Sequence, residues 1–145
     1  MPIELRQPKT EEEFRLYYDL RWRILREPWT QSRESATDGH ERDAFHLMAL
    51  EGGTLLVGVG RLHFNSPEEA QVRYMAVESD RARAGIGSLI LEKLEAHARA
   101  QGARRVVLNA RESAVPFYKK HYYVQGGRAS TEFEAVVHWR MMKEL

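Results

Sequence analysis

The stretch that decides the fold runs Tyr74-Met75-Ala76-Val77-Glu78-Ser79-Asp80-Arg81-Ala82-Arg83-Ala84-Gly85-Ile86-Gly87-Ser88. The apolar part predicts a strand, and the glycine turn leads directly into a helical pattern. The first N–H groups of a helix lack internal partners and lie at the positive end of its dipole. Glycines at that point let a phosphate group approach the backbone. Two arginines, Arg81 and Arg83, add positive charge beside the turn, so the pattern indicates an anion-binding turn.

Other uses of such a turn are only partly excluded. A dinucleotide-binding fingerprint needs a third small residue where this chain has Ile90, and a P-loop needs a lysine after the glycines. A plain strand-to-helix turn with solvated arginines fits the same residues.

The segments around this turn predict a mixed sheet. The helix carries an apolar face and ends at Gly102, and residues 104–108 predict a buried strand. Residues 71–109 therefore form a strand–helix–strand unit with a locally parallel pair. Upstream, apolar runs at 45–50, 54–64 and 71–78 are separated by turn residues and predict an antiparallel meander. The fold class is thus α/β or α+β with a mixed sheet.

The two ends of the chain add shorter elements. Residues 3–6 predict a first strand, and Thr10 with Glu13 forms a capping box that begins an amphipathic helix, which Pro28 stops. Residues 30–42 are polar and predict a loop. After the central unit we expect a short helix at 113–121 and closing strands at 122–125 and 133–142.

Composition narrows the class of protein. The chain has 145 residues, 43% of them hydrophobic and 30% charged, which favours a single globular domain over residues 1–145. A net charge of +1 gives no electrostatic reason to expect nucleic-acid or membrane partners. The chain contains no cysteine, which excludes disulfides and thiolate metal sites. Its N-terminus lacks a signal-peptide pattern, so we expect a cytoplasmic protein.

A second segment carries chemistry-bearing residues at a characteristic spacing. Asn109 is followed by Ala114, Phe117, Tyr118 and Lys120. Together with the glycine turn, this segment resembles the GNAT N-acetyltransferase superfamily, which uses acetyl-CoA to acylate amines. The resemblance covers residues 71–123, in order and with the right separations. It implies a mostly antiparallel central sheet with one parallel pair, flanked by about four helices.

The resemblance also implies the roles of individual residues. Acetyl-CoA would be the acyl donor, with no metal, and Tyr118 would protonate the departing thiolate, whose basicity is close to that of a phenol. A backbone N–H near Val77 would face the thioester oxygen. A primary amine of a small molecule or peptide would attack directly in a ternary complex. The implied cofactor-binding residues are Met75, Ala76, Val77, Arg83, Ala84, Gly85, Ile86, Gly87, Ser88, Asn109, Ser113 and Phe117.

The chain departs from the family pattern at three places. Ala82 stands where the family usually has Arg or Gln, so Arg81 or Arg83 would have to supply that contact. Gln71 stands where some members carry a glutamate base. The stretch from His121 to Tyr123 replaces the usual Leu-Gly-Phe ending, which affects packing more than chemistry.

The general base therefore stays open. The titratable candidates are Glu34, Asp38, His40, Glu41, Asp43, His46, His63, Glu132 and His138. The His40, Asp43 and His46 spacing fits no metal-ligand pattern well. Trp29, which follows Pro28, is a candidate for the wall of the acceptor site or for simple packing.

Two other functions remain as alternatives. A CoA-binding regulatory or interaction module would keep the fold without turnover, and a nucleotide-binding protein would use the turn for another pyrophosphate. The acceptor is not identified by the sequence: an amino acid, polyamine, aminoglycoside or peptide N-terminus all fit. A homodimer formed by sheet extension at strand 133–142 is also expected.

Overall fold

The computed structural model describes residues 2–130 and 136–145. Its strands form one seven-stranded sheet in the order β1-β2-β3-β4-β5-β7-β6. The strands are β1 (Ile3–Arg6), β2 (Phe45–Glu51), β3 (Leu55–Phe64), β4 (Glu69–Val77), β5 (Arg105–Arg111), β6 (Val124–Ala129) and β7 (His138–Glu144). The α-helices in the described ranges are α1 (Glu11–Leu25), α2 (Ile86–Ala100) and α3 (Val115–Lys120). The predicted mixed α/β class is confirmed, with short 3₁₀ segments in addition to these three helices rather than a fourth α-helix.

The first helix begins and ends where the sequence predicts. The Thr10 hydroxyl accepts a hydrogen bond from the Glu13 N–H at 3.1 Å, which satisfies one of the free donors at the start of α1. The helix ends at Leu25, and Pro28 lies in the 3₁₀ turn Glu27–Trp29 that follows. This turn brings the end of α1 toward the middle of the sheet.

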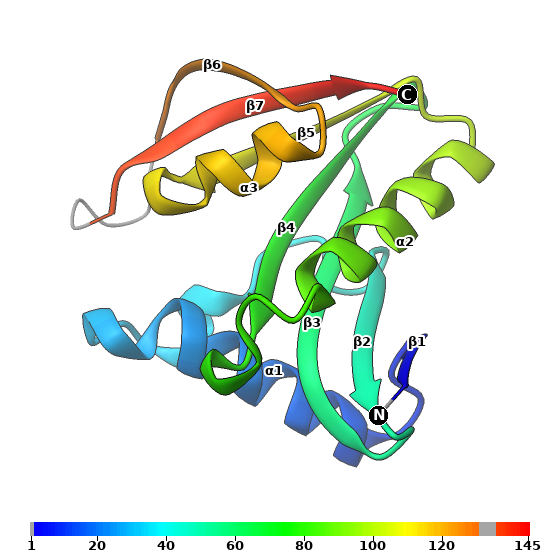
Figure 1. The fold of residues 1–145 in the computed structure, drawn as a ribbon, viewed down its shortest axis with the longest axis vertical. Coiled ribbons are helices and arrows are strands. Elements are labelled where there is room, and N and C mark those ends of the chain that lie inside the picture. Colours follow the sequence, from blue (N-terminus) through cyan, green and yellow to red (C-terminus); the bar gives the residue numbers. More distant parts are fainter. Residues whose placement is uncertain (1, 131–135) are drawn as a thin grey trace.

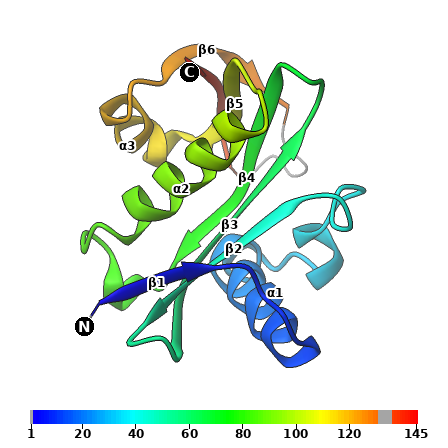
Figure 2. The ribbon, with the colours of Figure 1, turned by 90° about the vertical axis from the view of Figure 1, so that its right-hand side faces the viewer.

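Helices α1 and α2 cover opposite faces of the sheet (Figure 2). The alternation in β2 shows the division, because Leu47 and Ala49 belong to the core under α2 whereas Met48 and Leu50 belong to the core under α1. Burial on both faces explains why this strand is apolar throughout. On β3, a Cβ added to Gly60 would lie 2.7 Å from Ile90 Cγ2, so the glycine lets α2 pack directly on the strand.

The parallel pair separates after a short contact. Strands β4 and β5 are paired only at Glu69–Arg105, Ala70–Val106 and Gln71–Val107. Beyond these pairs β4 stays with β3 and β5 stays with β7. The two strands therefore diverge and form a splay, which Figure 1 shows between β4 and β5.

A bulge in β4 lies in the splay. In the pairing with β3, Arg73 is opposite Arg61 and Ala76 is opposite Val59, so Tyr74 and Met75 together face Gly60. Tyr74 has a φ of 58°, a left-handed conformation that a tyrosine rarely adopts. Bulges bend a strand and re-aim its side chains, and this one lies just beyond the last pair between β4 and β5, Gln71–Val107.

The last two strands correct one expectation. Strand β7 lies between β5 and β6 and is therefore not an edge strand. The expected edge position of this strand is wrong, because β7 is paired on both sides and the edges of the sheet are β1 and β6. The homodimer itself stays a prediction. Residues 133–135 of that predicted strand lie outside the described residues. None of the helices in the described part of the chain is long and apolar enough to span a bilayer.

Candidate active site

A groove of about 710 Å³ lies where β4 meets the start of α2. Nine of the predicted cofactor-binding residues line it: Met75, Ala76, Val77, Arg83, Gly85, Ile86, Gly87, Ser88 and Phe117. Residues from β4, α2 and α3 therefore meet at one groove, which joins the two sequence segments that predicted it.

The backbone at the start of α2 has the features of an anion site. Gly85 is the N-cap residue with a φ of 81°, and the Leu89 N–H makes the first bond of the helix, to the Gly85 carbonyl at 3.1 Å. The N–H groups of Ile86, Gly87 and Ser88 come before that bond and have no backbone partner in the described structure. A Cβ on Gly85 would meet no atom within 4 Å, so the turn is open to a ligand. These groups fit a pyrophosphate.

The two arginines of the turn differ in their contacts. Arg81 is paired with Glu51, at 2.8 Å from Nε to Oε2, and with Asp80 at 2.9 Å. Arg83 makes no ion pair with any residue that the structure describes, and it lines the groove. Arg83 is thus the better placed of the two to supply the contact that Ala82 lacks.

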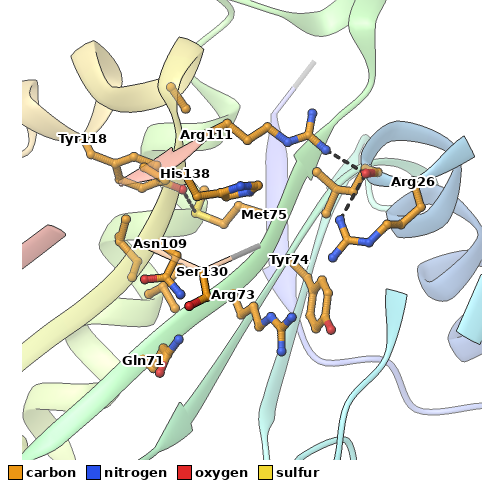
Figure 3. Close-up of a pocket in the computed structure, with 15 residues that line it drawn as sticks. Arg26, Gln71, Arg73, Tyr74, Met75, Asn109, Arg111, Tyr118, Ser130 and His138 are labelled. Atoms are coloured by element: carbon orange, nitrogen blue, oxygen red, sulfur yellow. Dashed lines mark hydrogen bonds between the residues drawn. The ribbon is translucent and has the colours of Figure 1, made fainter. Parts of the chain in front are cut away.

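A second cavity, of about 150 Å³, lies in the splay on the side of α1 (Figure 3). It contains space for on the order of ten waters, enough for a small molecule. Its lining comes from the end of α1, from β4, β5 and β7, and from the segments beside α3: Leu25, Arg26, Gln71, Val72, Arg73, Tyr74, Met75, Leu108, Asn109, Ala110, Arg111, Ala114, Tyr118, Ser130 and His138.

Tyr118 stands between the two spaces. It lines both the groove and the cavity, as do Met75 and Ala114. Its hydroxyl lies 3.6 Å from the Met75 Sδ, and the side chain is 8% exposed. Burial raises the pKa of Tyr118 well above its ordinary value, so the phenol keeps its proton throughout the physiological pH range.

The remaining predicted cofactor residues lie elsewhere. Asn109 is exposed in a strand whose neighbouring residues are buried, and it lines the splay cavity rather than the groove. Ala84 and Ser113 line neither space. The splay explains the exposure of Asn109, since β4 has already diverged from β5 at this position.

Four of the nine candidate bases, Asp38, Glu41, His46 and His63, are held in a network under α1. The buried Arg61 is paired with Asp38 at 2.6 Å and with Glu41 at 2.7 Å, and it donates to His63 Nδ1 at 2.8 Å. His46 interacts with the Tyr17 hydroxyl at 2.8 Å. These side chains are held by ion pairs and hydrogen bonds to their neighbours, which indicates a structural role.

Three other candidates, His40, Asp43 and Glu34, do not line the splay cavity. The His40 ring stacks on His63 at 4.0 Å, and His40 Nδ1 lies 3.6 Å from Asp43. Glu34 lines a shallow hollow beside α1. Glu132 lies outside the described residues. In the described ranges, no three His, Asp or Glu side chains gather as a metal site would require.

His138 is the candidate base that lines the cavity. Its Nδ1 lies 3.1 Å from the Val136 carbonyl, so that nitrogen donates and Nε2 carries the lone pair. Burial lowers the pKa of His138, and the charges of Arg111, Arg26 and Arg73 lower it further. The ring is therefore neutral and able to accept a proton near pH 7.

Sequence reasoning missed the arginines of this cavity. Arg26, Arg73 and Arg111 line the cavity. Two of them also lie over the Tyr74 ring, with Cζ to centroid distances of 5.7 Å for Arg26 and 4.5 Å for Arg73. A usable signal was present in the strands, where polar side chains recur at every second position: Gln71 and Arg73 on β4, Asn109 and Arg111 on β5.

Comparisons with known proteins agree with this geometry. Residues 14–122 match the model of the Acetyltransferase (GNAT) family. The uncharacterized N-acetyltransferase YjcF of Bacillus subtilis (strain 168) is 31% identical over 140 residues, covering 94% of this chain and 96% of that protein.

Solved structures with low identity share the fold. Escherichia coli ElaA has a TM-score of 0.81 at 16% identity, covering 99% of this chain and 100% of its own. An aminoglycoside 6'-N-acetyltransferase complexed with coenzyme A has a TM-score of 0.78 at 17% identity, covering 99% of this chain and 97% of its own. The match of the family model to most of the chain, together with the 31% identical relative, establishes that this protein belongs to the GNAT family of acetyltransferases.

Proposed function

We propose that the protein transfers an acetyl group from acetyl-CoA to the primary amine of a small molecule or peptide, by direct attack in a ternary complex. The observation that carries this proposal is the meeting of groove and cavity at Tyr118. Donor and acceptor entering from the two sides of the splay would reach each other there without a covalent enzyme intermediate.

The donor side depends mostly on backbone groups. The N–H groups of Ile86, Gly87 and Ser88 hold the pyrophosphate, and Arg83 adds a positive charge beside it. Acetyl-CoA supplies an activated acyl group on a thiol leaving group. Asn109 lines the splay cavity. Its predicted contact is therefore with the end of acetyl-CoA that lies nearest to the acceptor.

Proton transfer is divided between two residues of the cavity wall. The neutral Tyr118 hydroxyl donates a proton to the departing thiolate. His138 accepts a proton from the acceptor amine at Nε2, either directly or through a water, because its Nδ1–H is engaged by the Val136 carbonyl. The two groups line the same cavity, as a reaction with one acid and one base requires.

Two measurements test the proposal. Calorimetric titration with acetyl-CoA, CoA and ATP determines which ligand binds, and we expect the two CoA species to bind and ATP not to bind. Thiol release over a panel of primary amines then measures turnover. Binding of CoA with no thiol release on any amine favours the regulatory module instead, and selective binding of ATP overturns the donor assignment.

A further inference from the structure

A chain of hydrogen-bonded side chains leads from the network under α1 to the splay cavity. Arg61 Nη2 lies 2.8 Å from His63 Nδ1, and His63 Nε2 lies 3.1 Å from Asn65 Oδ1. Asn65 Nδ2 in turn lies 3.0 Å from Gln71 Oε1. Gln71 lines the cavity and forms the last pair of β4 with β5, opposite Val107. The chain therefore ends where the splay begins.

Arg61 fixes the direction of the hydrogen bonds at the buried end of this chain. A guanidinium group only donates hydrogen bonds, so His63 Nδ1 accepts from Arg61. Burial and the charge of Arg61 lower the pKa of His63 to about 4, so the ring is neutral near pH 7 and carries its one proton on Nε2. His63 Nε2–H therefore donates to Asn65 Oδ1.

Glu69 fixes the same direction independently at the other end. Its Oε2 lies 2.8 Å from Asn65 Nδ2, and its Oε1 accepts from Arg105 at 2.9 Å. These two hydrogen bonds lower the pKa of Glu69, and an ionised carboxylate only accepts. Asn65 therefore turns its NH2 group toward Glu69 and toward Gln71 Oε1. If this amide were reversed, its oxygen would face two other acceptor oxygens.

The Gln71 amide is held in one orientation as a result. Its oxygen accepts from Asn65, so its two N–H groups point the other way. Figure 3 shows the Gln71 nitrogen on the side of the other labelled residues of the cavity. Within the part of the chain that the structure describes, this nitrogen has no hydrogen-bond partner. Both N–H groups can therefore donate to a ligand in the cavity.

Gln71 and the proposed proton donor lie at different ends of the cavity. Figure 3 shows Gln71 at one end and Tyr118 and His138 at the other. The Tyr118 hydroxyl contacts Met75, which follows Gln71 by four residues on β4. At the ordinary rise of a strand, this separation is on the order of 10 Å. A molecule that contacts both ends therefore needs several bonds between its two contacting groups.

We propose that Gln71 selects acceptor amines in which an oxygen without a proton, such as the carbonyl oxygen of an amide, lies several bonds from the reacting nitrogen. This inference rests on the proposed function and narrows its substrate class. The Gln71 N–H groups bind the oxygen, while the amine lies near Tyr118 and His138. Short peptides and amides of long amino acids fit this description, whereas protonated polyamines carry only hydrogen-bond donors.

Asn65 is a positioning residue in this proposal. Its hydrogen bond keeps the N–H groups of Gln71, and not the carbonyl oxygen, on the side of the acceptor. The orientation depends in turn on His63 and Glu69, which hold the Asn65 amide from its two sides.

The experiment compares primary amines that differ in this oxygen. One series contains the N,N-dimethylamides of glycine, 4-aminobutanoic acid and 6-aminohexanoic acid, whose carbonyl oxygen lies progressively farther from the amine. The other contains the branched alkylamines of the same lengths. Each kcat/KM with acetyl-CoA is divided by the value for Gln71→Met, so that differences in amine basicity cancel. We expect a ratio of about tenfold for the longer dimethylamides, and of less than about twofold for the glycine dimethylamide and the alkylamines.

Asn65→Asp tests the orientation of the amide. A carboxylate only accepts, so Gln71 has to turn its nitrogen toward this side chain and its oxygen toward the cavity. We expect the same selective loss on the longer dimethylamides, and no further loss when Asn65→Asp is combined with Gln71→Met. A merely structural role of Asn65 would instead reduce kcat/KM on every acceptor and would add to the effect of Gln71→Met.

Two controls accompany these variants. Gln125→Met makes the same change on β6, at a residue that does not line the cavity, and should behave as wild type. Thermal melting checks that the variants fold, because Asn65→Asp places a carboxylate beside Glu69.

Calorimetric titration of the dimethylamides into the protein with CoA gives a readout that needs no turnover. Binding that Gln71→Met weakens, in a protein that releases no thiol on any amine, supports the contact and contradicts the proposed function. An equal effect of Gln71→Met on dimethylamides and alkylamines overturns the inference while the proposed function stands. If no dimethylamide binds or reacts, the inference is also overturned, and the wider amine panel alone decides the proposed function.

Discussion

At the scale of single residues, Tyr118 keeps its proton and lines both the groove and the cavity. The buried phenol has the Met75 sulfur as its neighbour at 3.6 Å, a weak acceptor that leaves the hydroxyl proton available. Its raised pKa prevents ionisation at any pH at which the protein works. The same burial makes packing a second role of the ring, so the two roles have to be separated by a substitution that keeps the ring.

Tyr118→Phe keeps the ring and removes the proton donor. We expect kcat to fall by roughly a hundredfold or more, the usual scale of general acid–base catalysis. The melting temperature and the Kd for acetyl-CoA should change little, because the hydroxyl makes one weak contact. Steady-state thiol release and calorimetry measure these quantities. Near-normal turnover in the variant means that the thiolate leaves unassisted.

His138→Gln tests the base. In wild-type protein, kcat should fall as the pH drops through the pKa of His138, which burial and three arginines place below the ordinary histidine value. Arg111, Arg26, Arg73 and Tyr118 face the same cavity and do not titrate in that range. The variant should lose about a hundredfold in kcat and also this acid limb. If the substitution leaves the pH profile of kcat unchanged, a group other than His138 titrates in this range.

Residue spacing was enough to find Tyr118 and the glycine turn, but not the arginines. The spacing from Asn109 to Tyr118 lies within one local segment, so sequence order already brings these residues together. Arg26 and Arg111 lie 85 positions apart in the chain numbering and meet at the carbonyl of Leu25 only after the splay forms. The polar residues at every second position of β4 and β5 indicate a polar face there. They do not show that the two strands separate, because alternation is the same in paired and diverging strands.

At the scale of elements, the proposed donor site depends most on the start of α2. Gly87 has ordinary helical geometry, and a Cβ there would lie 3.4 Å from Phe117 Cζ. Glycine is therefore needed at this position to keep the groove open, and not for the backbone conformation. Gly85, with its φ of 81°, is needed by the turn itself.

Gly87→Val should weaken the donor without unfolding the protein. The branched side chain crowds Phe117 and covers the N–H groups, so we expect the Kd for acetyl-CoA to rise more than tenfold. Stability should change little, since valine has no worse helix propensity than glycine. Gly39→Val is the matched control, because a Cβ at Gly39 meets nothing within 4 Å. Unaltered affinity for acetyl-CoA in a folded Gly87→Val protein contradicts the assignment of the pyrophosphate to the start of α2.

The elements themselves were predictable, but their order in the sheet was only partly so. Turn residues and capping indicated where β2, β3, β4, α1 and α2 begin and end. The position of β7 between β5 and β6 was not foreseen, because a strand's neighbour depends on long-range pairing and not on its own pattern. For the same reason the sequence did not show the β4 bulge at Tyr74.

At the scale of the whole molecule, the network under α1 makes stability depend on pH. The pKa of His63 is lowered to about 4 by burial and by the charge of Arg61 and the neighbouring His40, against the opposing charge of Asp38. An unfolded histidine titrates near 6.5. Between these values the unfolded chain binds more protons than the folded one, so stability falls as the pH falls from about 6.5 to 4.

The expected loss is on the order of 3 kcal/mol over that window. Urea unfolding at several pH values between 7.5 and 4 measures it. His63→Gln, which has no proton to gain at this position, should lose less stability over the same window by about that amount. The lowered pKa values of His46, His97 and His138 leave the same remaining loss in both proteins. Asp38 contributes at lower pH. Burial alone would raise the pKa of Asp38, but Arg61 and the His40 N–H hold it well below its usual range. Further stability is therefore lost below about pH 4. An equal slope in both proteins means that His63 is not responsible.

The open N–H groups of Ile86, Gly87 and Ser88 have a consequence for how this protein can change over generations. A main-chain donor is present whatever side chain the position carries, so the proposed pyrophosphate site would survive sequence drift provided that the glycines persist. The acceptor wall, in contrast, consists of side chains such as Arg111 and His138, and each can be exchanged by one codon change. New acceptors can therefore be acquired in few steps while the donor chemistry is inherited unaltered.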